Sequence, residues 1–198
     1  LVAPDSETVR FVRERRGVEI ALEPWMHGDE GAIYAHTLTV DCTALEPMLA
    51  SPGDPGNGLP LSALPEPVRI DLAYVGSCTG GKREDLRVAY EAIREAAAQG
   101  RRVPDHVQFF VQCGSEAVRQ YAEAKGWMDA FRAVGATVLG SSCGACINAG
   151  PGVSARPDQV TISAINRNFP GRSGPGQMWL ASPATVAASA LAGEIRKA

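Results

Sequence analysis

Apolar residues recur along the second part of this chain at two alternating spacings, which predict strands and helices. Four short apolar runs have the character of buried strands, at residues 69–76, 106–112, 136–140 and 159–165. Four segments carry apolar residues at helical spacing or have helix start and stop signals, at residues 83–100, 115–126, 126–135 and 182–198. Strands that alternate with helices predict an α/β fold with a mostly parallel sheet and helices on both faces.

The first 50 residues have shorter and less regular elements. A helix is predicted from Ser6, as its N-cap, to Gly17, and short strands are predicted at 18–22 and 35–41. Five prolines and three glycines then occur between residues 50 and 67, which predicts a loop. We therefore expect a tail of a preceding domain at 1–50, a Pro/Gly-rich loop at 51–67 and an α/β domain at 68–198 that carries the functional residues.

Chemically reactive side chains gather in three loops that each follow a predicted strand. These loops read GSCTGG at 76–81, GSSCGACINAG at 140–150 and NRNFPGRSGPG at 166–176. Because functional residues of open α/β sheets gather at the carboxyl ends of the strands, the three loops should share one edge. This arrangement would bring Cys78, Cys143 and Cys146 together, with Arg167 and Arg172 beside them.

Cys143 and Cys146 have the C-x-x-C spacing, which occurs in redox pairs, in zinc sites and among iron–sulfur ligands. Residues 150–152 read Gly-Pro-Gly, so no helix is expected after Cys146 to lower a thiol pKa, which disfavours a redox pair. A structural zinc site usually takes two pairs of ligands, whereas Cys78 is a single third thiol. Three thiolates around a metal centre would leave one coordination position open for chemistry.

Other candidate side chains have more ordinary interpretations. Cys42 and Cys113 are expected to be small buried apolar residues, and the three scattered histidines are expected to be structural. Arg167 and Arg172 lie five residues apart in a Gly/Pro/Asn loop, where two guanidinium groups suit the binding of carboxylates.

Composition excludes several classes of function. The net charge is −3 without a long charged run, so a nucleic-acid partner is not indicated. No apolar run approaches the roughly 20 residues that a membrane helix needs. No signal peptide is visible and the cysteines are odd in number, so we expect reduced thiols and a cytoplasmic location. Leu1 is not an initiator methionine, so we expect the start to be a cut.

Three segments together resemble the aconitase superfamily, and within it the large subunits of 3-isopropylmalate dehydratase and the homoaconitases. They carry G-S-C-T, C-x-x-C and N-R-N-F-x-G-R in that order, at 74–93, 140–150 and 163–195. The resemblance covers nearly the whole chain and corresponds to the latter part of a large subunit, roughly its third domain. One departure is Gly80, which stands where the family commonly has asparagine.

The resemblance implies that Cys78, Cys143 and Cys146 bind a 4Fe–4S cluster and that Asn166, Arg167 and Arg172 bind substrate. It implies dehydration and rehydration of a hydroxy di- or tricarboxylic acid, such as 3-isopropylmalate, homocitrate, homoaconitate or citrate. It also implies partners, namely upstream domains and a small subunit or swivelling domain that supplies the base, so the chain alone is expected to be inactive. The alternatives are a non-catalytic iron–sulfur or metal-binding module and, behind it, a thiol–disulfide oxidoreductase.

Overall fold

The structure is a computed structural model that describes residues 2–198. It divides into two compact units, one that ends at Ala44 and one from Leu45 to Ala198, and each is described by itself. None of the described helices is both long and apolar enough to cross a membrane.

The N-terminal unit contains one regular helix, α1 (Ser6–Arg16). Its N-cap is Asp5 rather than the expected Ser6, because the Asp5 carboxylate accepts the Thr8 backbone N–H at 2.9 Å while the Thr8 hydroxyl accepts the Asp5 N–H. This reciprocal pairing satisfies two backbone donors at once. The helix ends as predicted at Gly17, which adopts the left-handed conformation with φ of 65°.

The strands predicted at 18–22 and 35–41 do not form. This stretch holds only the short 3-10 helices η1 (Pro24–Met26) and η2 (Cys42–Ala44), and no residue described in this unit is buried. A strand needs a pairing partner and an apolar surface to cover, and the described part of this unit offers neither. Cys42 is exposed for the same reason, which corrects the expectation that it is buried.

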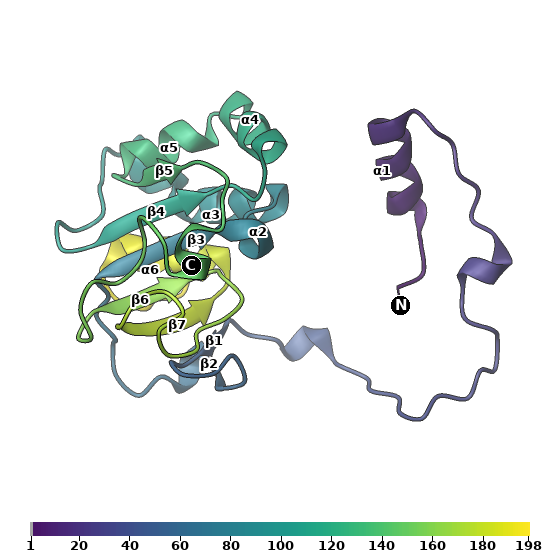
Figure 1. The fold of residues 1–198 in the computed structure, drawn as a ribbon, viewed down its shortest axis with the longest axis horizontal. Helices are drawn as coiled ribbons and strands as arrows, with labels where there is room; N and C mark the ends of the chain where they lie inside the picture. The colour runs from purple at the N-terminus through teal and green to yellow at the C-terminus, as the bar shows by residue number, and fades with distance from the viewer. Residues whose placement is uncertain (1) are drawn as a thin grey trace. The chain divides into compact units, whose positions relative to one another are not determined.

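The larger unit is built on a seven-stranded sheet (Figure 1). In chain order the strands are β1 (Met48–Ala50), β2 (Gly58–Pro60), β3 (Leu72–Gly76), β4 (Gln108–Gln112), β5 (Thr137–Leu139), β6 (Val160–Ser163) and β7 (Gln177–Ala181). Their order across the sheet is β2-β1-β7-β6-β3-β4-β5. The five strands from β7 to β5 are parallel, and β1 and β2 extend the sheet in antiparallel fashion. The predicted α/β class and mostly parallel sheet are confirmed.

The helices of this unit mostly begin and end where the sequence signals them. They are η3 (Leu61–Ala63), α2 (Ser77–Gly80), α3 (Arg83–Ala98), α4 (Glu116–Ala124), α5 (Trp127–Ala133), η4 (Gly144–Ile147) and α6 (Pro183–Ala192). Ser115 caps α4 and Ser182 caps α6, each by accepting a backbone N–H three residues ahead. Pro183 follows as the first residue of α6, as expected.

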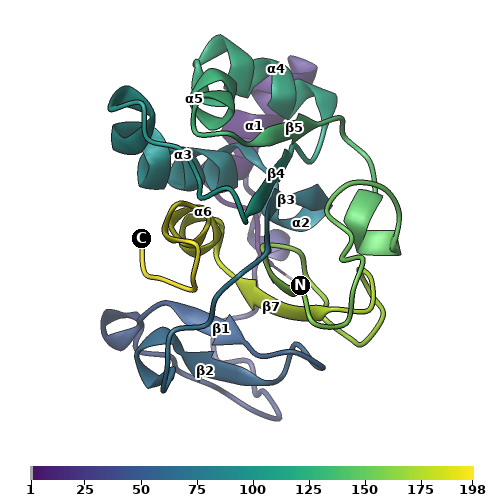
Figure 2. The same cartoon turned by 90° about the vertical axis from the view of Figure 1, so that its left-hand side faces the viewer.

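One face of the sheet carries the long helices and the main core. Leu86, Ala89 and Ile93 of α3 pack fully buried against Val75 of β3 and Val111 of β4 in one cluster, which also includes α5 and α6. Each fully buried leucine or isoleucine stabilises the fold by about 1.5–3 kcal/mol. Figure 2 shows α3 and α6 on the same side of the sheet.

The other face of the sheet is covered by the short 3-10 helix η4 and by loops. Leu72, Tyr74 and Phe110 point to this face and pack against Ala145 and Cys146 of η4. Loops rather than long helices complete the cover, because the connections after β5 and β6 are rich in glycine and proline and cannot continue a helix. Two of the three chemically reactive loops therefore lie over this face.

The Pro/Gly-rich segment at 51–67 contains a strand. Its glycines and prolines form the turn between β1 and β2, where Ala50 pairs with Gly58, and η3 follows directly. In the structure this segment therefore belongs to the larger unit, although the sequence suggests only a loop. The assignment of residues 1–50 to a preceding domain stays a prediction.

Candidate metal centre

The first reactive loop is a tight strand-to-helix turn that begins at the end of β3. Gly76 has φ of 117° and Ser77 has φ of 86°, which is rare for a residue with a side chain. The turn buries Ser77 and leaves Cys78 exposed at the start of α2. Lys82 closes the turn by donating from Nζ to the Cys78 carbonyl oxygen at 3.0 Å.

Glycines in this turn are required by close backbone contacts. A Cβ atom on Gly76 would lie 1.8 Å from the Gln112 carbonyl oxygen, and one on Gly81 would lie 2.4 Å from the Ser77 carbonyl oxygen. A Cβ atom on Gly80 would lie 2.4 Å from the Ala164 carbonyl oxygen. This backbone therefore has no room for the asparagine that the family commonly carries at position 80, and the departure matches the packing of this chain.

The C-x-x-C pair lies in the second loop, in the 3-10 helix η4. Cys143 is its exposed N-cap, and Cys146 is buried with 8% exposure. The Cys146 N–H donates to the Cys143 carbonyl oxygen at 2.9 Å, which fixes the backbone between the two thiols. No α-helix follows Cys146 in the described chain before β6, in agreement with the sequence analysis.

The third loop, which follows β6, carries the predicted substrate residues. Asn166 and Arg167 are exposed, and Arg167 donates from Nη1 to the Asn166 carbonyl oxygen at 2.7 Å. Arg172 is half-buried, and its Nε is buried without a hydrogen-bond partner. No ion pair among residues 2–198 involves either arginine.

The pKa of the Cys146 thiol is raised by its surroundings. Burial is the largest effect and raises the pKa of the Cys146 thiol, and the charges of Cys78 and Cys143 raise it further. A hydrogen bond from Ser77 and the positive charge of Arg172 lower this pKa. The three loops leave the same edge of the parallel sheet, after β3, β5 and β6, and Ser173 joins the second and third of them by its bond to Ala145. Within the described chain, neither Asn166 nor Arg167 is among the groups that shift the pKa of the Cys146 thiol.

Among residues 2–198, no three His, Cys, Asp or Glu side chains lie close enough to hold one metal ion. The thiolates of an iron–sulfur cluster bind separate irons, so their sulfur atoms need not converge on one point. Cys78, Cys143 and Cys146 are the thiols that could hold such a cluster, and the unpartnered Arg172 Nε is a donor that an anionic ligand could use.

Hydrogen bonds between loops hold the site together and involve serines that the sequence analysis missed. The buried Ser173 hydroxyl of the third loop donates to the Ala145 carbonyl oxygen, between the two thiols of η4. Ser154 donates its hydroxyl to the Ser173 carbonyl oxygen at 3.1 Å and accepts the Gly176 N–H at 2.8 Å. No local motif marks these serines in the sequence, because their partners lie about 20 or more residues away.

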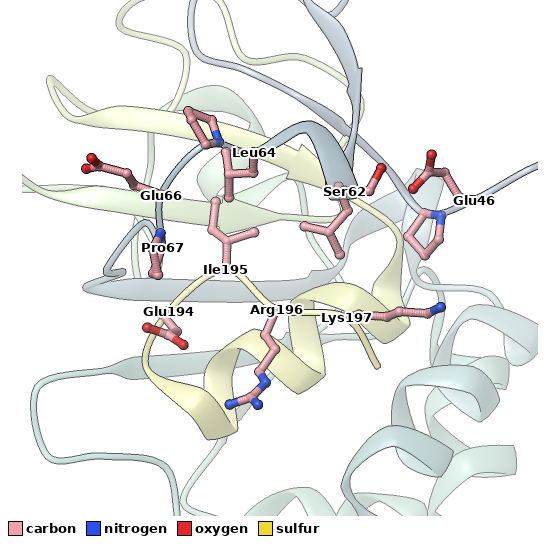
Figure 3. A pocket seen from close by; sticks show the side chains of 12 residues that line it. Glu46, Ser62, Leu64, Glu66, Pro67, Glu194, Ile195, Arg196 and Lys197 are labelled. Carbon is pink, nitrogen blue, oxygen red and sulfur yellow. The ribbon is translucent and has the colours of Figure 1, made fainter.

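Two pockets differ in their relation to the thiols. One, of about 530 Å³, is lined by Gln112 and by residues around Cys143 and Ile147. The other, of about 380 Å³, is formed by η3 and the segment after α6, where Leu64 and Ile195 point toward each other (Figure 3). None of the predicted site residues lines the second pocket, so the first is the one that belongs to the candidate site.

Fold and site together define an α/β domain with a cysteine-lined centre at the carboxyl ends of its parallel strands. Residues 63–193 match the aconitase family (aconitate hydratase). The chain is 38% identical to the 3-isopropylmalate dehydratase large subunit of Aquifex aeolicus over 98% of its length, and equally identical to large subunit 1 of Methanopyrus kandleri over 98%. It is 40% identical to the large subunit of Mycolicibacterium smegmatis over 87%.

The chain belongs to the aconitase family. The match spans 44% of the Aquifex aeolicus protein, 45% of the Methanopyrus kandleri protein and 40% of the Mycolicibacterium smegmatis protein. The chain thus corresponds to less than half of the length of these relatives. The family resemblance read from the sequence motifs is confirmed.

Proposed function

We propose that this chain forms the cluster-binding and carboxylate-binding part of an iron–sulfur hydro-lyase. Its substrate is a hydroxy di- or tricarboxylic acid, and the names of the relatives favour 3-isopropylmalate. The observation that carries the proposal is that the loops bearing Cys78, Cys143, Cys146 and Arg172 all leave the carboxyl edge of one parallel sheet, after β3, β5 and β6, and that Ser173 joins the second and third loops by its bond to Ala145. The three thiols are the ligands of a 4Fe–4S cluster.

The arginines orient the substrate. Arg172 has a buried Nε without a partner, so a carboxylate oxygen there would satisfy a donor that the described protein leaves unpaired. Arg167 and Asn166 are exposed at the start of the same loop and are free to bind a second carboxylate or a hydroxyl group. A guanidinium group binds a carboxylate through two parallel hydrogen bonds, which fixes the plane of the substrate.

A cluster held by Cys78, Cys143 and Cys146 would supply Lewis acidity toward the substrate hydroxyl. The residues of this chain hold the cluster and the carboxylates, and the glycine-rich turns keep side chains away from this edge. The remaining part of a large subunit and a smaller partner subunit complete the enzyme and supply the base. The chain alone therefore binds the hydroxy acid without turning it over.

Substrate binding by the reconstituted chain tests the proposal. The chain is loaded anaerobically with iron and sulfide, and 3-isopropylmalate or citrate is titrated while the electron paramagnetic resonance and Mössbauer spectra are recorded. We expect the hydroxy acid to perturb the spectrum of one iron. In Arg172→Ala the titration should shift to about tenfold to hundredfold higher concentration, because a hydrogen bond to a charged group contributes roughly 1.5–3 kcal/mol.

Arg156→Ala is the matched control, since Arg156 pairs with Asp158 at 3.1 Å on the surface and no described contact connects it with the thiols. This variant should titrate like the unchanged chain. A spectrum that no hydroxy acid perturbs would contradict the proposed substrate class. Turnover by the isolated chain would contradict the dependence on partners.

A further inference from the structure

A buried polar pair lies beneath the C-x-x-C loop on the second face of the sheet. Tyr74 of β3 and Gln112 of β4 lie on adjacent parallel strands, and each is 1% exposed. The Tyr74 hydroxyl donates to the Gln112 Oε1 at 2.7 Å. The pair faces the metal centre but contributes no ligand to it.

The side-chain amide nitrogen of Gln112 donates to the loop that leads to Cys143. Its Nε2 donates to the Gly140 carbonyl oxygen at 2.9 Å and to the Ser142 hydroxyl oxygen at 2.8 Å. Ser142 directly precedes Cys143, so this glutamine fixes the position from which η4 begins. Tyr74 in turn fixes the rotation of the amide by occupying Oε1.

The same pair also limits how closely the loop can approach the sheet. A Cβ atom on Gly144, between the two thiols, would lie 3.2 Å from the Tyr74 hydroxyl and 3.3 Å from the Gln112 Nε2. A Cβ atom on Gly152 would lie 2.4 Å from Tyr74 Cδ2, so the loop also packs closely on the edge of the ring. The height of η4 above the sheet is therefore set by these two side chains.

Burial makes this arrangement specific. A buried amide or phenol without partners destabilises the fold, so the pair favours the one loop position in which its donors and acceptors are satisfied. We propose that Tyr74 and Gln112 are positioning residues that hold Cys143 and Cys146 at the height the metal centre requires. Cys78 lies in the turn after β3, whose close contacts with Gln112 are to its backbone and not to its side-chain amide. The inference rests on the proposed function in one respect: it takes the metal centre as the reason why Cys143 and Cys146 must be positioned.

Three variants test the pair in the metal-free chain. Tyr74→Phe removes one hydroxyl, Gln112→Met keeps the length of the side chain without its hydrogen bonds, and Ser142→Ala removes the exposed acceptor in the loop. Rates of alkylation by iodoacetamide are measured for each cysteine by mass spectrometry. We expect alkylation of the buried Cys146 to be about threefold to tenfold faster, the factor that the loss of one hydrogen bond gives, while the exposed Cys78 is unchanged.

Matched controls remove the same groups elsewhere. Tyr90→Phe acts on the helix-covered face, where Tyr90 stacks on Trp127. Gln159→Met removes a buried amide that accepts the Ala155 and Arg156 N–H groups in the turn before β6. Both controls should leave the three alkylation rates within about twofold of the unchanged chain. Equal rates in all variants would overturn the inference, and so would a uniform increase that includes Cys78.

Reconstitution separates this inference from the proposed function. If the unchanged chain binds a cluster, Tyr74→Phe and Gln112→Met should lose its visible absorption and iron several-fold faster than the two controls do. Equal loss would overturn the positioning role. If the unchanged chain binds no cluster, the proposed function fails, and the alkylation rates alone decide whether the pair positions the thiols.

Discussion

Replacing Gly76 by alanine tests how closely the turn before Cys78 is packed. In the structure, the added Cβ atom would lie 1.8 Å from the Gln112 carbonyl oxygen, 2.7 Å from its carbon and 3.0 Å from the Gln112 nitrogen. All three are backbone atoms of the adjacent strand, so no flexible side chain can move away. Gly76 also has φ of 117°, a conformation that side chains strongly disfavour.

The loss of stability in Gly76→Ala has two parts, backbone strain and steric overlap, which a control variant separates. Strained backbone at such a position contributes about 1–3 kcal/mol, and forcing the overlap apart contributes about another 1–3 kcal/mol. We therefore expect Gly76→Ala to lower the free energy of unfolding by about 3–5 kcal/mol. Gly100→Ala is the control, because Gly100 has φ of 68° but nothing within 4 Å of its Cβ position. That variant should lose only about 1 kcal/mol.

Urea denaturation followed by circular dichroism measures both variants. With a slope of about 1.5–2 kcal/mol/M, the midpoint of Gly76→Ala should fall by about 2 M, and that of Gly100→Ala by about 0.5 M. Because β3 positions Cys78, Gly76→Ala should also alter the alkylation rate of Cys78. A difference of less than about 1 kcal/mol between the two variants would refute the claim that backbone contact with β4 requires this glycine.

Three further predictions concern other parts of the larger unit. Ser173→Ala should lower the free energy of unfolding by about 1–3 kcal/mol, because the buried Ala145 carbonyl oxygen loses its donor, and Ser62→Ala on the surface is the control in the same urea assay. Ser115→Ala should cost about 1 kcal/mol by removing the cap of α4; a helix signal and midpoint equal to those of the unchanged chain would contradict this. Burial raises the pKa of Cys113 from an ordinary value of 9.0 to about 11, so its neutral form stabilises the fold fully below pH 9 and this contribution disappears as pH rises toward 11. The free energy of unfolding, measured from pH 9 to pH 11, should therefore fall more steeply in the unchanged chain than in Cys113→Ala. Parallel curves would refute the raised pKa of Cys113.

Much of the fold can be predicted because its elements carry local signals. The apolar runs of β3 and β4 and the serine caps of α4 and α6 fix these elements without distant information. The three-residue strands β1 and β2 lie in a segment whose prolines and glycines suggest only a loop. β7 is missed because it directly follows a Gly/Pro loop and lies half-buried beside β1.

The candidate site is only partly visible in the sequence. The shared edge of parallel strands predicts that Cys78, Cys143 and Cys146 come together, and the strands before their loops are parallel members of one sheet. The Tyr74–Gln112 bond joins residues 38 positions apart, so no spacing rule reveals it. The opposite error occurs at residues 18–22 and 35–41, where the sequence predicts strands that do not form. Their residues favour extended backbone, but no neighbouring strand of the described chain pairs with them.

The most direct test of the central claim is the iron content of cysteine variants after anaerobic reconstitution. Cys78→Ser, Cys143→Ser and Cys146→Ser are compared with Cys42→Ser, which lies outside the larger unit, and Cys113→Ser, which lies in the helix-side core. The account predicts a four-iron cluster in the unchanged chain and in the last two variants, and a loss of iron and visible absorption in each of the first three. Full cluster content without Cys78 would contradict it.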